Sequence, residues 1–322
     1  MRKILILFLI LCFAQISGYC AKIDIQSKHQ SIDVDKNKGV FTGDVQVQIG
    51  DVIVKSPKAD LDLDPATKKP SIATFIENPY SFQEKGSKKH EIKAQIIKVS
   101  LLKKTLFASG NSQTIILEDR EPVIILNADS QEYDTTTNIM KANGAVIINH
   151  TDLETISDKA EAYIDKTGDI RNVKLFGHVT MKQKGNIIKG DKFSFKDLNS
   201  IFTIEGNTSS DVVFEDGTKV FVKADTQQFD RRTNTMIASG HIQINYKDYV
   251  AQGPKAHMLV DKATNKPDKI IFTGRSKITQ NDSTIEADRI ELIIEPKGFK
   301  ADGNVKTSIT TSDDEEDMEF IK

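Results

Sequence analysis

Hydrophobic and polar residues alternate along most of this chain. Val45, Val47 and Ile49 are separated by glutamines, and Leu61 and Leu63 are separated by aspartates. A period of two places successive side chains on opposite faces of a β-strand. Outside the first 20 residues the sequence has no apolar stripe of helical period, so the pattern predicts an all-β protein.

The alternating segments belong to internal repeats. Residues 128–149 and 224–245 are identical at 11 of 22 positions, and the motif Lys-Ala-x-x-x-x-Asp occurs at 58–64, 159–165 and 255–261. We expect a lead-in at 21–30, followed by three blocks of about 96 residues at 31–126, 127–222 and 223–310. Because no Pro/Gly/Ser-rich linker separates the blocks, we expect one continuous body.

Each block divides again into strand–turn–strand units. A glycine followed by alternating apolar residues marks each unit, and Asn78 takes its place once; the glycine markers are Gly43, Gly110, Gly144, Gly177, Gly206, Gly240, Gly274 and Gly303. A glycine that opens a strand is typical of a bulge or a positive φ. Nine such units predict about 18 antiparallel strands, folded into two facing sheets that bury their oily faces and extend by repetition.

The first 20 residues differ from the rest and predict a secretory signal peptide. A basic start at Arg2 and Lys3 precedes an unbroken apolar run from Ile4 to Phe13, which is too short for a comfortable transmembrane helix. An uncleaved anchor is the alternative. Both cysteines lie at positions 12 and 20, so the mature protein is expected to use no disulfide.

Composition and motifs give little support for catalysis or nucleic-acid binding. The 44 Lys and Arg nearly balance the 46 Asp and Glu, so the chain has no basic footprint for nucleic acid. The segment 33–39 (DVDKNKG) resembles a calcium loop, but its glycine falls one position late and the twelfth-position glutamate is absent. Asp60, Asp62 and Asp64 fit the polar face of a strand as well as they fit a carboxylate pair. We expect no catalytic residue, no metal site and no cofactor.

The repeated unit AD-x-x-x-[FY]-D, a short turn and A-x-G-x-[IV]-x-[IV], behind a signal peptide, resembles the OstA-like or LptA family. The likeness covers roughly residues 31–310. It implies a twisted antiparallel β-jellyroll with an open groove that holds lipid acyl chains in the periplasm. It further implies lipopolysaccharide or a lipid A-like glycolipid as ligand, edge-strand pairing with inner-membrane LptC-like and outer-membrane LptD-like proteins, and head-to-tail self-association. LptC and the LptD N-terminal domain share the fold, so the role within the family stays open.

A groove of this kind would be lined by the apolar face of the strands. Exposing an acyl chain of a dozen carbons to water costs on the order of 10 kcal/mol, which many equivalent apolar sites would offset. The candidate lining residues are Val45, Val47, Ile49, Leu61, Leu63, Val146, Ile148, Ile164, Ile242, Ile244, Met258 and Val260. Each of them also fits an ordinary sandwich core.

Two other interpretations of the repeats remain. A structural or adhesive protein would have a closed core and no lipid, and a β-solenoid carbohydrate-active enzyme would have a polar cleft with paired carboxylates. The strands near 31–35 and 305–309 are the expected sheet edges, which can recruit another strand. Five consecutive acidic residues, 313–317, predict a solvated tail over 311–322.

Overall fold

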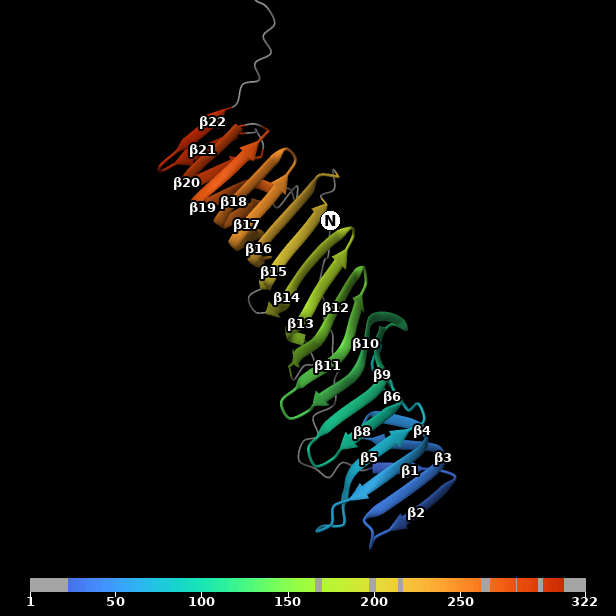
Figure 1. Cartoon of the computed structure of the whole chain (residues 1–322). Coiled ribbons are helices and arrows are strands. Elements are labelled where there is room, and N and C mark those ends of the chain that lie inside the picture. Colours follow the sequence, from blue (N-terminus) through green and yellow to red (C-terminus); the bar gives the residue numbers. More distant parts are fainter. Residues whose placement is uncertain are drawn as a thin grey trace, which may run out of the picture. The chain divides into compact units, whose positions relative to one another are not determined.

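The computed structural model describes residues 23–165, 170–196, 201–213, 217–261, 267–281, 283–294 and 298–309. These residues form 22 β-strands, all described pairings are antiparallel, and the described part of the chain contains no helix (Figure 1). No helix capable of crossing a bilayer is therefore found among them. The expected signal peptide at 1–20 and the acidic tail at 311–322 lie outside the described residues. The all-β prediction is confirmed.

The chain divides into two compact units. The first contains residues up to 184 together with 189–202, and the second contains 185–188 and the residues from 203 onward. The strands that lie wholly or mainly in the first unit are β1 (Ile23–Gln26), β2 (His29–Asp33), β3 (Lys38–Ile49), β4 (Val52–Leu63), β5 (Pro70–Ile76), β6 (Tyr80–Lys85), β7 (Lys88–Lys93), β8 (Ile96–Ser100), β9 (Thr105–Glu118), β10 (Glu121–Asp134), β11 (Ile139–His150), β12 (Leu153–Ile164), β13 (Ile170–Gln183) and β14 (Asn186–Lys196).

The second unit is built in the same way. Its strands are β15 (Ile201–Val213), β16 (Lys219–Asp230), β17 (Thr235–Tyr246), β18 (Tyr249–Val260), β19 (Pro267–Gln280), β20 (Ser283–Ile293), β21 (Gly298–Asp302) and β22 (Lys306–Ile309). From β16 to β20 each strand pairs with the next along the chain. The division into three blocks of about 96 residues stays a prediction.

The count of 22 strands agrees with the expected 18 once four divided strands are recognised. β1 and β2 pair with the two halves of β3, and β5 and β6 pair with the two halves of β4. In the same way β7 and β8 pair with β9, and β21 and β22 pair with β20. Joining each of these four pairs into one interrupted strand reduces 22 to 18.

Seven of the eight glycine markers lie at corners in the middle of long strands, not at strand starts as expected, and Gly303 lies between β21 and β22. In β11, Gly144 and Ala145 have φ angles of 77° and 44°, and the register with β12 shifts between Asn143 and Val146. All nine markers, Asn78 included, have positive φ. A bulge of this kind bends the strand, so each long strand has two halves that point in different directions.

The repeated sequence after each Ala-Asp pair forms the turn at the other end of the strand. The carboxylate of Asp134 accepts hydrogen bonds from the backbone N–H of Thr136 (2.7 Å) and of Thr137 (3.1 Å). Asp230 does the same one repeat later. Asn138 then takes a positive φ of 57°, and its carbonyl accepts from the backbone N–H of Ile164 at 2.9 Å. The repeated polar residues therefore specify a turn.

Buried apolar side chains from both halves of the strands form the core. In the second unit, Phe272, Ile290 and Ala287 are fully buried within one cluster of residues from β16 to β20 and the residue that follows β20. Ala59, Ala160 and Ala256, the alanines of the Lys-Ala motif, are also buried. A small side chain is thus repeated at the same interior position of β4, β12 and β18.

Candidate functional site

The predicted groove residues lie in the interior. Ten of the twelve are buried, and Ile49 and Val260 are partly buried. The buried ones are Val45, Val47, Leu61, Leu63, Val146, Ile148, Ile164, Ile242, Ile244 and Met258. Burial fits both a lipid-binding interior and an ordinary core, so their role in binding stays a prediction.

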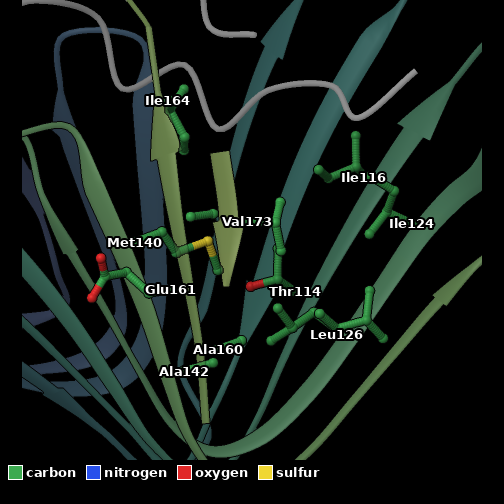
Figure 2. A pocket seen from close by; sticks show the side chains of 12 residues that line it. Thr114, Ile116, Ile124, Leu126, Met140, Ala142, Ala160, Glu161, Ile164 and Val173 are labelled. Carbon is green, nitrogen blue, oxygen red and sulfur yellow. The ribbon is translucent and has the colours of Figure 1, made fainter. Parts of the chain in front are cut away.

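The first unit contains an apolar cleft between the two halves of its bent strands. Leu126 and Ile148 come from one side of the corners, whereas Met140, Ala160 and Ile164 come from the other side. Figure 2 shows the side chains of Met140 and Thr114 pointing toward each other across this cleft, while the carboxylate of Glu161 points away from its centre. The strand halves on the two sides of the corners form two half-sheets. These half-sheets face one another across an apolar space.

The free space in this cleft is small. The cavity volume is about 50 Å³, whereas an apolar cavity that holds one benzene molecule measures about 150 Å³. An acyl chain would therefore enter only if side chains moved or the half-sheets separated. Met140 is suited to such movement, because methionine is unbranched and has three rotatable bonds.

Two further cavities lie among the predicted residues. One, of about 30 Å³, lies near the start of the first unit and is bordered by Val47, Ile49 and Leu61. The other, of about 20 Å³, lies in the second unit and is bordered by Ile244 and Met258. Its lining repeats that of the larger cleft at a distance of 96 residues, since Met236, Ala238 and Ala256 replace Met140, Ala142 and Ala160.

Sequence reasoning missed a buried polar network beside the larger cleft. Thr114 Oγ1 donates to Gln131 Oε1 at 2.6 Å, and Gln131 Nε2 donates to Ser112 Oγ at 3.1 Å. Ser112 Oγ in turn donates to the carbonyl of Ala128 at 2.9 Å. All three side chains are buried. We call Ser112, Thr114 and Gln131 the first polar triad.

The same network recurs in the second unit. Ser210 Oγ donates to Gln227 Oε1 at 2.7 Å, and Gln227 Nε2 donates to Thr208 Oγ1 at 2.9 Å. Thr208 Oγ1 donates to the carbonyl of Ala224 at 2.8 Å. We call Thr208, Ser210 and Gln227 the second polar triad. Departures from the Gly-x-[IV]-x-[IV] pattern after Gly110 and Gly206 were the sequence signal for both triads.

The aspartates considered for chemistry have structural partners. Asp60 and Asp62 form ion pairs with Lys58 and Lys38, respectively. Asp64 accepts hydrogen bonds from the backbone N–H and the hydroxyl of Thr67, which lower the pKa of its carboxyl group. These interactions belong to a turn and to the surface of a strand.

The calcium-like loop is also accounted for by its own contacts. Asp33 accepts a hydrogen bond from the backbone N–H of Lys36 at 3.0 Å, and the Lys36 ammonium group lies 3.0 Å from the same carboxylate. The pKa of Asp33 is lowered by these contacts. No group of three His, Cys, Asp or Glu side chains suited to a metal ion occurs within the described ranges.

One histidine is placed unusually. His90 on β7 is only 7% exposed, and its Nδ1 atom has no hydrogen-bond partner. Burial, assisted by the charge of Lys88, lowers the pKa of His90 to about 4. The imidazole is therefore neutral at physiological pH and forms part of the interior.

Among the residues that the structure describes, both ends of the strand series leave edges. β1 and β2 pair with β3, and β21 and β22 pair with β20. Apolar side chains are exposed here, namely Ile32 and Val34 at one edge and Phe299, Val305 and Ile309 at the other. The first edge begins at Ile23, within the segment expected as a lead-in, and is therefore longer than the segment 31–35.

Comparison with known proteins gives one family match. Residues 24–115 match the family described as LptA/(LptD N-terminal domain) LPS transport protein. None of the curated proteins matches the chain. The crystal structure of LptH, described as the LptA homologous periplasmic component of the conserved lipopolysaccharide transport device from Pseudomonas aeruginosa, aligns with a TM-score of 0.34 and 17% sequence identity. That alignment covers 39% of this chain and 84% of LptH. Residues 24–115, less than a third of the chain, are therefore similar to the LptA-type family.

Proposed function

We propose that this chain is a periplasmic bridge protein that binds the acyl chains of lipopolysaccharide, or of a lipid A-like glycolipid, between its two half-sheets. The observation that carries the proposal is the cleft lined by Ile116, Leu126, Met140, Ile164 and Val173, which is apolar on both sides. Such a surface suits hydrocarbon, because each buried methylene contributes about 0.8 kcal/mol. The family match at 24–115 supports lipopolysaccharide as the source of the acyl chains.

Binding would require the cleft to open. A volume of about 50 Å³ is too small for an acyl chain, so ligand entry must displace Met140 or separate the half-sheets. Burial of a dozen-carbon chain contributes on the order of 10 kcal/mol, which can offset the loss of some side-chain contacts. Because the apolar lining is repeated, neighbouring positions of the lipid along it would be similar in free energy. The direction of lipid movement would come from a partner in the inner membrane.

The edges supply a route to partners. Strands with open N–H and C=O groups pair with strands of another chain, so β1 and β2 at one edge and β21 and β22 at the other suit LptC-like and LptD-like partners. The same two edges would also support head-to-tail self-association of this chain.

Site-specific photocrosslinking tests the lipid-binding proposal. A benzophenone amino acid replaces Met140, which faces the cleft, or Lys141, its exposed neighbour on β11. After expression with export to a periplasm and irradiation, we expect a lipopolysaccharide adduct at position 140 and none at 141. Mass spectrometry of an organic extract should recover lipid A-like species in stoichiometric amounts.

The small cavity volume favours one alternative, a structural repeat protein whose core is closed. That function predicts equal, background crosslinking at both positions and no lipid in the extract. Such a result, obtained with folded protein, would reject lipid binding.

A further inference from the structure

The two polar triads occupy positions that apolar residues fill after Gly43, Gly144, Gly177 and Gly240; after Gly274 the first of these positions holds a buried serine, Ser276. The second and fourth residues after a corner glycine face the interior, and after Gly144 they are Val146 and Ile148. After Gly110 they are Ser112 and Thr114. The corresponding pairs after Gly43 and Gly240 are again apolar: Val45 with Val47, and Ile242 with Ile244.

The glutamines are equally unusual. Gln131 lies two residues after Asp129, the residue of β10 that covers the corner at Gly144. Two residues after the corresponding Asp158 of β12 the chain has Ala160, which is also buried. The bend therefore forms with alanine at this position and does not require glutamine.

Stability alone does not explain the triads. A buried polar network has to satisfy all its members, and apolar replacements of similar volume are often as stable or more stable. Both triads nevertheless repeat the same three positions and the same hydrogen-bond pattern 96 residues apart. Their repetition beside corresponding cavities points to a shared ligand.

Each triad contributes one side chain to a cavity lining that is otherwise mainly apolar. Thr114 lines the cleft of the first unit, with its hydroxyl pointing toward Met140 (Figure 2). Gln227 lines the cavity of the second unit beside Met236. A ligand in either cavity would be surrounded mainly by apolar side chains and would contact one polar side chain of the triad, Thr114 or Gln227.

The hydrogen bonds already made decide what this polar side chain can accept. Thr114 Oγ1 has given its only proton to Gln131, so toward a ligand it can act only as an acceptor. Both amide protons of Gln227 are also used, by Thr208 Oγ1 at 2.9 Å and by the carbonyl of Val222 at 3.3 Å. The Gln227 side chain can thus offer a ligand only the second lone pair of Oε1.

We propose that the two polar triads are hydroxyl-recognition subsites, which accept a hydrogen bond from a hydroxyl group carried on an acyl chain in the adjacent cavity. A neutral hydroxyl group can donate a hydrogen bond, and its transfer into hydrocarbon costs less free energy than that of an ion. A carboxylate or phosphate group has only acceptor oxygens when ionised, so it could not donate to Thr114 Oγ1 or Gln227 Oε1. The proposal rests on the proposed lipid-binding function and specifies the lipid further. It selects hydroxylated over unsubstituted acyl chains.

The test compares two glycolipids that differ in one hydroxyl group. Hydroxymyristoyl glucosamine and myristoyl glucosamine are titrated into delipidated full-length protein by calorimetry. One hydrogen bond in a buried site should make the hydroxylated probe bind roughly three- to tenfold more tightly. Equal affinities of the two probes for the wild-type protein would overturn the subsites while leaving lipid binding intact.

A repeat-matched variant assigns the preference to the triads. It carries Ser112→Val, Thr114→Ile and Gln131→Ala, which are the residues present at the corresponding positions Val146, Ile148 and Ala160. The second triad is changed to the same three residues, by Thr208→Val, Ser210→Ile and Gln227→Ala. We expect the variant to lose the preference, so that the ratio of its affinities for the hydroxylated probe and for myristoyl glucosamine falls to about one.

A smaller variant, Thr114→Val with Gln227→Leu, removes only the two cavity-facing acceptors and provides the same comparison if the larger variant does not fold. A preference that persists in either folded variant would overturn the proposal. If neither probe binds the wild-type protein, the lipid-binding function fails and this inference fails with it.

Discussion

The carboxylate of Asp129 covers Gly144, so closely that a Cβ atom built on the glycine would lie 2.0 Å from Asp129 Oδ2. The same relationship joins Asp158 to Gly177 and Asp225 to Gly240. At the latter two corners a histidine, His178 or His241, also contacts the aspartate through Nδ1, at 2.9 Å and 2.8 Å. An aspartate of one strand therefore fixes the bend of the next strand.

Replacing the corner glycine should destabilise the first unit strongly. Gly144→Ala places a side chain at a φ of 77°, which costs about 1–2 kcal/mol, and also forces Asp129 to move. We expect the free energy of unfolding to fall by more than about 2 kcal/mol in urea titrations. Circular dichroism is the suitable signal, because the chain has no tryptophan.

Gly50→Ala is the matched control for this prediction. Gly50 also has a positive φ, 58°, but a Cβ there would meet no atom within 4 Å. The Gly50→Ala substitution should lower the free energy of unfolding only by the cost of placing alanine at a positive φ, about 1–2 kcal/mol. Asp129→Ala combined with Gly144→Ala should recover part of the loss, and equal destabilisation by the two glycine variants would contradict the role of Asp129.

Removing a fully buried aromatic ring should damage the second unit. Phe272 on β19 is 0% exposed, so Phe272→Ala is expected to lower the free energy of unfolding by about 3–5 kcal/mol. Phe299→Ala on β21 is the control, since that ring is 48% exposed and its loss should change stability by about 0.5 kcal/mol or less. Thermal unfolding of both variants distinguishes them, and similar midpoints would argue against this core.

Stability of the first unit should depend on pH through His90. The pKa of this imidazole is lowered from 6.5 to about 4 in the folded protein. Between these values the unfolded chain binds the extra proton, so stability falls as pH decreases through this window. The loss should be on the order of 3 kcal/mol and complete below about pH 4.

His90→Leu removes this titration. The difference in unfolding free energy between pH 7.5 and pH 4 should shrink in the variant, whereas contributions from other groups, His150 included, remain in both proteins. Parallel pH profiles of wild type and variant would show that His90 is protonated without cost.

Self-association should depend on the last edge strand. Ile309 on β22 is 69% exposed, and Ile309→Lys places a charge on an open edge, which disfavours strand pairing. We expect a lower oligomer fraction in light scattering coupled to size exclusion, with stability nearly unchanged. Leu102→Lys alters a residue of similar exposure, 64%, in the turn between β8 and β9, and should leave the oligomer intact. Equal effects of both changes would point to general hydrophobic association.

The alternating pattern predicted the strands well because one face of each strand is buried. Val45, Val47, Val146 and Ile242 all lie in the interior, where period two places them. The marker glycines were recognised, but their position in mid-strand was not, since a bulge keeps the alternation on both sides of the bend. Without knowledge of the bend, four interrupted strands could not be separated into halves.

The site was less predictable. The cleft joins Leu126 to Met140 across a corner, a contact that no local pattern reports. Gln131 and Thr114 interact between two strands, and each alone fits the polar alternation of a strand surface. Only the comparison of every repeat unit with its neighbours shows that these polar residues replace apolar ones.

The contact between an aspartate of one strand and the corner glycine of the next also suggests that the number of hairpins can vary. If β17 and β18 (Thr235–Val260) were excised, Asp225 of β16 would meet Gly274 of β19 in place of Gly240, and an acid would again rest on a glycine. Neighbouring strands on either side of the cut would find a compatible surface. We therefore expect gain or loss of whole hairpins to be compatible with folding, so that descendants of one ancestor could differ in strand number.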